Sequence, residues 1–96
     1  MIITTEKNGT KAVIRPEGWI DAQSAPEFRA ALDALEPEIT ELVLDLQKLE
    51  YISSAGLRLI VTADKRMNGN LTVTNPSVEI LDVFRMTGFD KKLRIQ

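Results

Sequence analysis

Strand-like and helix-like segments alternate from one end of this chain to the other, and this order limits the fold more than any single motif does. Short apolar runs typical of strands are separated by stretches whose apolar residues recur at helical spacing. Strands that alternate with helices pair in parallel through right-handed crossovers. With 96 residues and no linker rich in Pro, Gly or Ser, the sequence predicts a single α/β domain spanning residues 1–96.

The expected elements follow the order β-β-α-β-α-β-α-β, which predicts a mixed, mostly parallel sheet. The first two strands are expected at 2–7 and 12–16, and Asn8-Gly9 between them favours a hairpin turn. The remaining expected strands cover 42–46, 71–74 and 93–95. Helices on such a sheet can leave one of its faces open, which the sequence alone does not decide.

Each expected helix has a recognisable start or stop. Ser24-Ala25-Pro26-Glu27 matches a capping box, with Glu three residues after the cap. The second helix is expected to begin at the Ser53-Ser54 pair and to end at Asn68-Gly69-Asn70, whose residues suit the left-handed conformation. Asn75-Pro76 predicts a cap followed by the first residue of a third helix, which Gly88 stops.

The composition excludes several kinds of chemistry. The chain contains no histidine and no cysteine, so Ser-His-Asp and Cys-His catalysis and thiolate or imidazole zinc sites cannot be built. Neither a P-loop nor a Gly-x-Gly-x-x-Gly motif is present. We therefore expect a protein that is not an enzyme and that binds no cofactor or metal.

Charge and hydropathy predict a cytoplasmic protein. Lys and Arg number 12 against 14 Asp and Glu, and the net charge of -2 gives no general attraction for nucleic acid or anionic lipid. No segment reaches the ~18 to 20 apolar residues of a membrane span, and the chain does not open with a signal peptide. We therefore expect protein partners rather than nucleic acid or membrane.

The segment from Asp45 to Arg58 is the most informative about function. An apolar run ending at Asp45 is followed, after a short connection, by the Ser53-Ser54 pair at a helix start, and Gly56 leaves the backbone there open. The free N–H groups and the dipole at a helix N-terminus favour an anion. A serine at this position is often only an N-cap. The two roles are compatible, because a capping serine already lies at the end of the helix that favours an anion, and the segment predicts a phosphorylation switch rather than catalysis.

Four segments together resemble the STAS domain, the fold of bacterial anti-sigma factor antagonists. They are Gly18-Trp19-Ile20-Asp21, Leu44-Asp45-Leu46, Tyr51-Ile52-Ser53-Ser54-Ala55-Gly56-Leu57 and Met86-Thr87-Gly88-Phe89. The resemblance covers nearly the whole chain, and its specific part is the Ser-Ser-Ala-Gly-Leu stretch. The other segments would fit many small α/β domains.

The resemblance implies a binding module controlled by a kinase. In this family the unphosphorylated antagonist binds an anti-sigma factor that is also a serine kinase, and the sigma factor is released. The kinase phosphorylates the antagonist on a serine, which ends binding, and a metal-dependent serine phosphatase restores it. The phosphorylated serine lies two positions before the glycine that precedes leucine, which here is Ser54. We expect a monomer or a weak dimer.

The resemblance also implies a set of residues around Ser54. Many members carry Asp, Ser and then Ser or Thr before the glycine, whereas this chain replaces the carboxylate with a second hydroxyl. Asp21 and Asp45 would lie beside Ser54, where they would bind its hydroxyl or a kinase-bound metal and repel the phosphate. The expected neighbours of the acceptor are Asp21, Asp45, Ser53, Ala55 and Gly56, and the expected partner-binding residues are Trp19, Asp21, Ser54, Leu57 and Arg58.

For several of these residues a structural role is an alternative. Asp21 and Asp45, taken singly, also suit ordinary strand ends. Alternation along the strand turns one of Trp19 and Ile20 outward, and Ile20 is the better core residue. Trp19 is then either a partner anchor or a partly buried packing residue. Arg58 is either a solvated residue of the first turn or a partner for the phosphate or the bound protein.

Other functions compete with the phosphorylation switch. A STAS subunit of a lipid-transport complex, or the regulatory domain of a transporter, would bind partners without phosphorylation, and the hydroxyl of Ser54 argues against both. A nucleotide-binding module would have only one helix N-terminus to hold phosphates. A small enzyme is the weakest alternative, since the residues for catalysis are missing.

Overall fold

One mixed sheet organises the molecule, and the computed structural model describes it over residues 1–96. The sheet has six strands in the order β1-β2-β3-β5-β6, with β4 paired to β2. Only β1 and β2 run antiparallel, so the predicted mixed, mostly parallel sheet is confirmed. The strands are β1 (Ile2–Asn8), β2 (Lys11–Ile20), β3 (Glu41–Asp45), β4 (Leu49–Ile52), β5 (Leu71–Thr74) and β6 (Arg94–Ile95). The helices are α1 (Ala25–Asp33), α2 (Ser54–Arg66) and α3 (Val78–Thr87), followed by a 3-10 turn at Phe89–Lys91.

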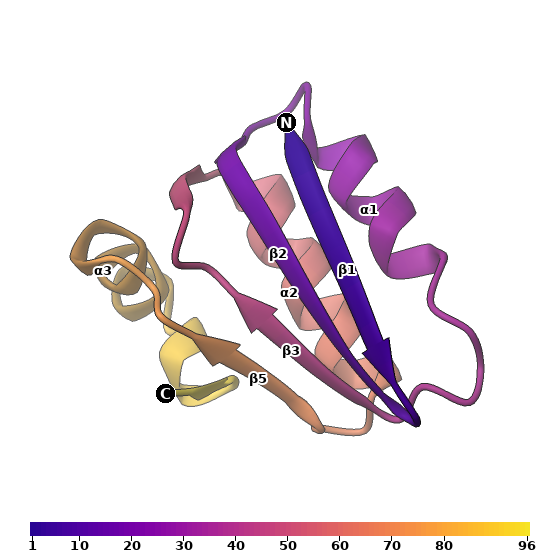
Figure 1. Cartoon of the computed structure of the whole chain (residues 1–96). Helices are drawn as coiled ribbons and strands as arrows, with labels where there is room; N and C mark the ends of the chain where they lie inside the picture. The colour runs from indigo at the N-terminus through magenta and orange to yellow at the C-terminus, as the bar shows by residue number, and fades with distance from the viewer.

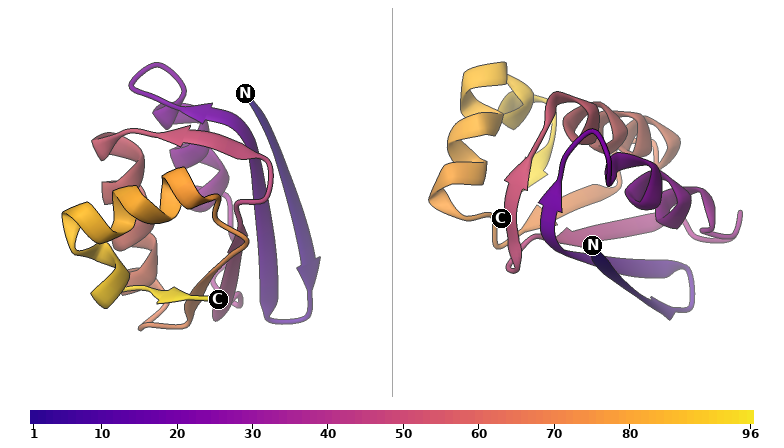
Figure 2. Two further views of the ribbon diagram at one scale, coloured as in Figure 1. Left: turned by 90° about the vertical axis from the view of Figure 1, so that its left-hand side faces the viewer. Right: turned by 90° about the horizontal axis from the view of Figure 1, so that it is seen from above.

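The helices cover only one face of the sheet. Figure 1 shows α1 and α2 side by side behind β1, β2 and β3, and Figure 2 shows α3 next to β4. Toward α1 and α2, alternate strand residues such as Ile14 and Leu44 are fully buried, whereas Val13 and Arg15 between them are only half-buried. The opposite face is therefore open, and Arg15 crosses it to reach Glu6 at 2.6 Å.

The hairpin and the helix ends follow local backbone chemistry. Asn8 pairs with Lys11, which leaves Gly9 and Thr10 as the turn, and Gly9 takes a φ of 64° that suits glycine. The stop of α2 is confirmed, since Asn68 and Gly69 have φ values of 53° and 83°. Gly88, with a φ of 78°, ends α3 as predicted.

The strand β4 is an element that the sequence interpretation missed, because only a short connection was expected before the second helix. It pairs in parallel with the last part of β2, whereas β3 pairs with the first part. Only its two terminal residues, Leu49 and Ile52, are buried, so the four residues lack the alternation that indicates a strand. The strand β2 likewise continues beyond the expected end at Pro16, which lies between the β3-paired and β4-paired stretches.

One predicted helix cap is wrong, and another lies at the predicted residue, Ser24, but lacks the predicted hydrogen bonds. The third helix begins at Val78 with Ser77 as its cap, whose Oγ accepts a hydrogen bond from Ile80 N at 3.2 Å. Asn75, the predicted cap, has a φ of 56° and its side-chain amide donates to Asp45. The first helix lacks the predicted capping box, because the Ser24 hydroxyl points back along the chain. None of the helices has the length and apolar character required to cross a bilayer.

Candidate functional site

The start of α2 is held by the end of β2. Ser53 N donates to Ile20 O at 2.7 Å, which ties the residue before the helix to the last residue of β2. The Ser53 Oγ accepts from Gly56 N at 3.3 Å, so Ser53 is the N-cap. Its hydroxyl satisfies one of the four N–H groups that a helix start leaves without partners. Ser53 therefore has a structural role.

Ser54, the predicted phosphate acceptor, is the first residue of α2 and is exposed. Its hydroxyl makes no hydrogen bond within the protein, and the first turn of α2 contains no acidic residue. The side chain is thus accessible and the electrostatic environment of the helix start favours an anion. Of the two adjacent serines, the structure leaves only Ser54 with a free, exposed hydroxyl.

Gly56 lets α2 approach the sheet closely. A Cβ atom at this position would lie 2.7 Å from Ile20 Cγ2 and 2.8 Å from Ile52 Cγ1, which is closer than such atoms can approach. Leu57, the next residue, is only 3% exposed and packs in the core. The prediction that Leu57 binds a partner is therefore wrong, because the α2 face that carries Leu57 is turned toward the sheet.

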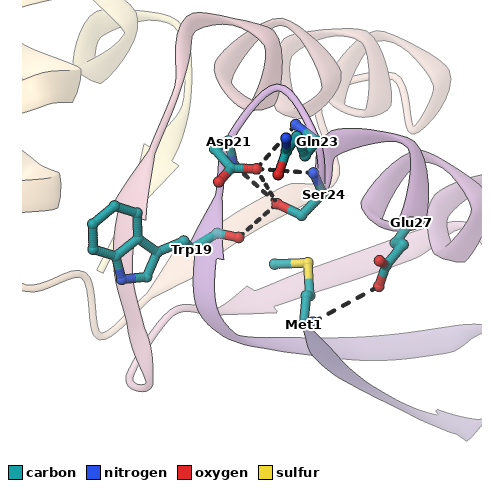
Figure 3. Close-up of polar contacts among 6 residues, drawn as sticks. All are labelled: Met1, Trp19, Asp21, Gln23, Ser24 and Glu27. Carbon is teal, nitrogen blue, oxygen red and sulfur yellow. Dashed lines mark hydrogen bonds and ion pairs between the residues drawn. The ribbon is translucent and has the colours of Figure 1, made fainter.

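Asp21 closes a tight turn between β2 and α1 (Figure 3). Its Oδ1 accepts hydrogen bonds from Gln23 N at 3.0 Å and from Ser24 N at 2.9 Å. Ser24 Oγ accepts from Asp21 N at 2.9 Å and lies 2.7 Å from Trp19 O, the carbonyl to which it donates. The Ser24 hydroxyl is thus engaged with Trp19 and Asp21 instead of the first turn of α1, which explains the missing capping box.

Hydrogen bonding keeps the Asp21 carboxylate charged. The bond from the Ser24 backbone N–H is the largest cause, followed by the Ser24 hydroxyl, and together they lower the pKa of Asp21 below its ordinary value. Asp21 directly follows Ile20, whose carbonyl binds Ser53, so the carboxylate and the start of α2 lie at the same end of the sheet. This part of the predicted site is brought together by the fold.

Trp19 lies on the surface at the same end of β2, and Ile20 beside it is fully buried, as alternation predicted. Trp19 is 58% exposed and packs against Tyr51 of β4, with 5.3 Å between the ring centroids and 41° between the ring planes. Sequence reasoning did not single out Tyr51 as a site residue. Recognising the strand β4 would have identified Tyr51, because the pairing of β4 with β2 places Tyr51 opposite Trp19.

Asp45 does not lie beside Ser54, contrary to prediction. It ends β3 at the level of Arg15 in β2, whose Nε is 3.3 Å from Asp45 Oδ2. The start of α2 is instead bound at Ile20. At ~3.3 Å per strand residue, these two levels of β2 are roughly 15 to 20 Å apart. The unpredicted strand β4 accounts for the separation, because it carries the chain from the end of β3 to the end of β2.

The contacts of Asp45 give it a structural role instead. Burial alone would raise its pKa, but hydrogen bonds from Asn75, Gln47 N and Arg15 outweigh that effect, and the pKa is lowered. Arg15 also binds Glu6, so the carboxylate belongs to a polar chain across the open sheet face. Asp45 therefore joins β2, β3 and the segment before α3.

Arg58 lies one turn after Ser54 on the exposed side of α2. Its guanidinium forms no ion pair within the protein, in contrast to Arg66, which contacts Asp33 at 3.2 Å. Ala55, another predicted neighbour, is half-buried and lines with Arg58 a shallow depression of about 330 Å³ between α1 and α2. The outer side of α2 near Ser54 is therefore basic.

The start of α2 presents an exposed acceptor hydroxyl, that of Ser54. No three side chains among His, Cys, Asp and Glu lie close enough to hold a metal ion. The carboxylate of Asp21, at the end of β2 to which α2 is tied, is occupied by its own turn. What this end of the molecule presents to solvent is a free hydroxyl, a guanidinium and an aromatic pair.

Named proteins are similar to this chain in sequence and in fold. The family model described as the STAS domain matches residues 1–96. BtrV of Bordetella bronchiseptica, which carries the name of a putative anti-sigma factor antagonist, is 30% identical over 93 residues. That match covers 93% of this chain and 80% of BtrV.

Solved structures show the same fold at lower sequence identity. An anti-sigma factor antagonist from Mycobacterium paratuberculosis matches with a TM-score of 0.87 and 23% identity, covering 98% of this chain and 83% of that protein. Unphosphorylated SpoIIAA matches with a TM-score of 0.84 and 20% identity, covering 99% of this chain and 88% of SpoIIAA. Phosphorylated SpoIIAA from Bacillus matches with a TM-score of 0.76 and 20% identity, covering 99% of this chain and 91% of that protein.

Proposed function

This chain belongs to the STAS domain family, and from that premise we propose that it is an anti-sigma factor antagonist switched by phosphorylation of Ser54. The observation that carries the proposal is the difference between the two serines at the start of α2. Ser53 caps the helix, whereas Ser54 is exposed and free of hydrogen bonds. A kinase can therefore modify Ser54 without disturbing the helix cap.

In the proposed cycle, the unphosphorylated chain binds an anti-sigma factor that is a serine kinase, and the sigma factor is released. Phosphorylation of Ser54 ends binding, and a serine phosphatase restores it. The chain itself supplies no catalytic group, in keeping with its lack of histidine and cysteine. A structural relative, SpoIIAA, is known in both phosphorylated and unphosphorylated forms, which supports a fold that accepts the modification.

The switch works through charge at the binding surface. A phosphate adds about -1.5 to -2 charges at pH 7, and the start of an exposed helix stabilises such a charge by only ~0.3 to 1 kcal/mol. The basic outer side of α2 suits an acidic partner surface, and there the phosphate costs several kcal/mol through desolvation and like-charge contact. The second effect is larger. About 3 kcal/mol weakens a complex by roughly a hundredfold.

The test is phosphate mapping with matched serine variants. The chain is incubated with ATP and an anti-sigma factor kinase from its own organism, and the modified residue is identified by intact mass and peptide mapping. Ser54→Ala should abolish the added mass. Ser53→Asn is the control, because asparagine keeps the helix cap but cannot accept phosphate. Loss of phosphate in Ser53→Asn together with its retention in Ser54→Ala would contradict the assignment.

A binding measurement completes the test. The unphosphorylated chain should bind the kinase, and the phosphorylated chain should bind about a hundredfold more weakly. If the chain binds the kinase but is never phosphorylated, the function is that of a binding subunit without a switch. If it neither binds the kinase nor is phosphorylated by it, the proposed function is wrong.

A further inference from the structure

An exposed aromatic pair lies at the end of β2 and β4. Trp19 and Tyr51 are 58% and 44% exposed, and their rings are in contact. Gly18 pairs with Leu49 and Trp19 with Tyr51, so Glu50 is an extra residue in β4, and both Glu50 and Tyr51 face solvent. These two aromatic rings from neighbouring strands form one surface. We name Trp19 and Tyr51 the aromatic pair.

Two acidic hollows lie along β2 and β4, and Trp19 lines one of them. Trp19 lines a shallow hollow of about 390 Å³ whose carboxylates are Glu17, Asp21 and Glu27. The hollow of about 540 Å³ beside β4 contains Glu50 and a second glutamate from α3. Glu17 and Glu50 form no ion pair within the protein, and Glu27 meets only the N-terminal ammonium, at 4.0 Å.

Few positive charges balance these carboxylates. Lys48 is the one basic side chain among the residues that line the two hollows, and the N-terminal ammonium of Met1 is the other cation. Figure 3 shows the Met1 ammonium directed at Glu27, while the indole of Trp19 projects on the other side of β2. The carboxylates nearest the aromatic pair along the strands are therefore Glu17, two residues before Trp19 in β2, and Glu50, next to Tyr51 in β4.

We propose that the aromatic pair and Glu17 form a docking surface for an arginine-bearing segment of the partner protein. A guanidinium stacks on aromatic faces and pairs with carboxylates, which no neutral or acidic side chain does. Trp and Tyr are also the residues that most often carry the binding energy of an interface. The inference rests on the proposed function for the identity of the partner, which is the anti-sigma factor kinase.

The docking surface adjoins the phosphorylation site without including it. Ser53 N is bonded to the carbonyl of Ile20, the residue after Trp19, so a protein that covers Ser54 also reaches the indole. The partner footprint then has two parts: an acidic part faces α2, and an arginine stacks on the aromatic pair. Phosphorylation weakens the contact of the acidic part with α2. The arginine contributes the same attraction whether or not Ser54 is phosphorylated.

The first experiment measures the affinity of the kinase for variants of this chain by calorimetry. Trp19→Ala should weaken binding about thirtyfold, as at an interface hot spot, and Glu17→Gln should weaken it several-fold at low salt and less at high salt. Met86→Ala is the control, since Met86 is 86% exposed on α3 and should leave the affinity unchanged. Equal affinity of Trp19→Ala and the unaltered chain would overturn the proposal.

The second experiment tests the chemistry without the kinase. Trp19 is the only tryptophan, so its fluorescence is titrated with a short arginine-containing peptide and with the same peptide carrying neutral citrulline. Arginine should change the fluorescence at lower concentration than citrulline, and Glu17→Gln should reduce the difference. Identical titrations would rule out arginine as the occupant, whether or not the kinase binds.

Self-association is the remaining outcome to measure. If sedimentation shows a dimer that Trp19→Ala abolishes, the surface is an interface between two copies of this chain, and the proposed occupant is wrong. If the kinase neither binds nor phosphorylates the chain but the arginine peptide does bind, the proposed function fails while the arginine surface stands.

Discussion

At the scale of single residues, two adjacent serines have different roles because of their positions relative to α2. The hydroxyl of Ser53 bonds to Gly56 N, whereas the hydroxyl of Ser54 points to solvent without a partner. A capping hydroxyl contributes to folding, and a free one does not. The stability of the fold and the availability of the phosphate acceptor therefore depend on different side chains.

This difference predicts that two conservative substitutions affect the stability of the fold differently. Ser53→Ala should lower the free energy of unfolding by about 1 kcal/mol through loss of the cap, and the melting temperature by about 4 to 8 °C for a domain of this size. Ser54→Ala should change the melting temperature by less than ~2 °C, because no hydrogen bond is lost. Thermal unfolding followed by circular dichroism measures both. An equal loss in Ser54→Ala would reveal a structural role for that hydroxyl.

At the scale of elements, the stability of α2 depends on which charges lie at its two ends. The first turn contains no acidic residue, while Lys65 and Arg66 lie in the last turn and complement the dipole. A negative charge at Ser54 would complete this arrangement. A positive charge at the same position would oppose it.

Substitutions of opposite charge at Ser54 therefore separate folding from binding. Ser54→Asp should keep the fold and change the free energy of unfolding by no more than ~1 kcal/mol, in the stabilising direction, while affinity for the kinase falls. Ser54→Lys is the matched control and should be slightly less stable than the unaltered chain. Urea unfolding gives the stabilities and calorimetry the affinities. A fall of more than ~10 °C in the melting temperature of Ser54→Asp would contradict the exposed position of this side chain.

The elements also show how much the sequence could predict. Long periodic segments such as α2 were predicted with their ends, because helical spacing and left-handed stop residues are local signals. The hydrogen bonds of the α1 cap and the cap residue of α3 were not, since Ser24 bonds to Trp19 O and Asn75 to Asp45, contacts that local patterns do not contain.

The missed strand had the largest effect on the predicted site. The resemblance implied that Asp45 lies next to Ser54, but the unpredicted strand β4 separates them. Tyr51 was overlooked because only the ends of this four-residue strand are buried. The resemblance to a family located Ser54 by motif spacing, and alternation along β2 placed Trp19 outward and Ile20 inward. Leu57 was misassigned because its position on the helix, rather than its nearness to Ser54 in the chain, decides its burial.

At the scale of the whole molecule, three carboxylates make the free energy of unfolding depend on pH in the acidic range. Hydrogen bonds from Ser24 lower the pKa of Asp21, and the hydrogen bond from Lys7 lowers that of Glu36. Burial alone would raise the pKa of Asp45, but its hydrogen bonds outweigh this effect, and the pKa is lowered. A carboxyl whose pKa is lower in the folded state binds protons more readily when unfolded. Its contribution is present above the unfolded pKa and is lost as the pH falls through the folded value.

Stability should therefore be nearly constant near neutral pH and should fall below pH ~4, where the unfolded carboxyls begin to take up protons. Asp21→Asn should retain the turn, because the amide oxygen can accept the same hydrogen bonds. This variant should lose less stability between pH 4 and pH 2 than the unaltered chain, and Asp45 and Glu36 account for the loss that remains. Urea unfolding at a series of pH values tests this, and parallel curves for the two proteins would count against it.

The close fit of Gly56 has a consequence for the speed of the proposed switch. Since the start of α2 is wedged against Ile20 and Ile52, with Ser53 tied to the carbonyl of Ile20, the helix has no room to shift when Ser54 changes charge. No slow rearrangement within this chain then stands between phosphorylation and its effect. Release of a partner would begin at the moment of phosphoryl transfer, and its time course would follow the dissociation rate of the modified complex alone.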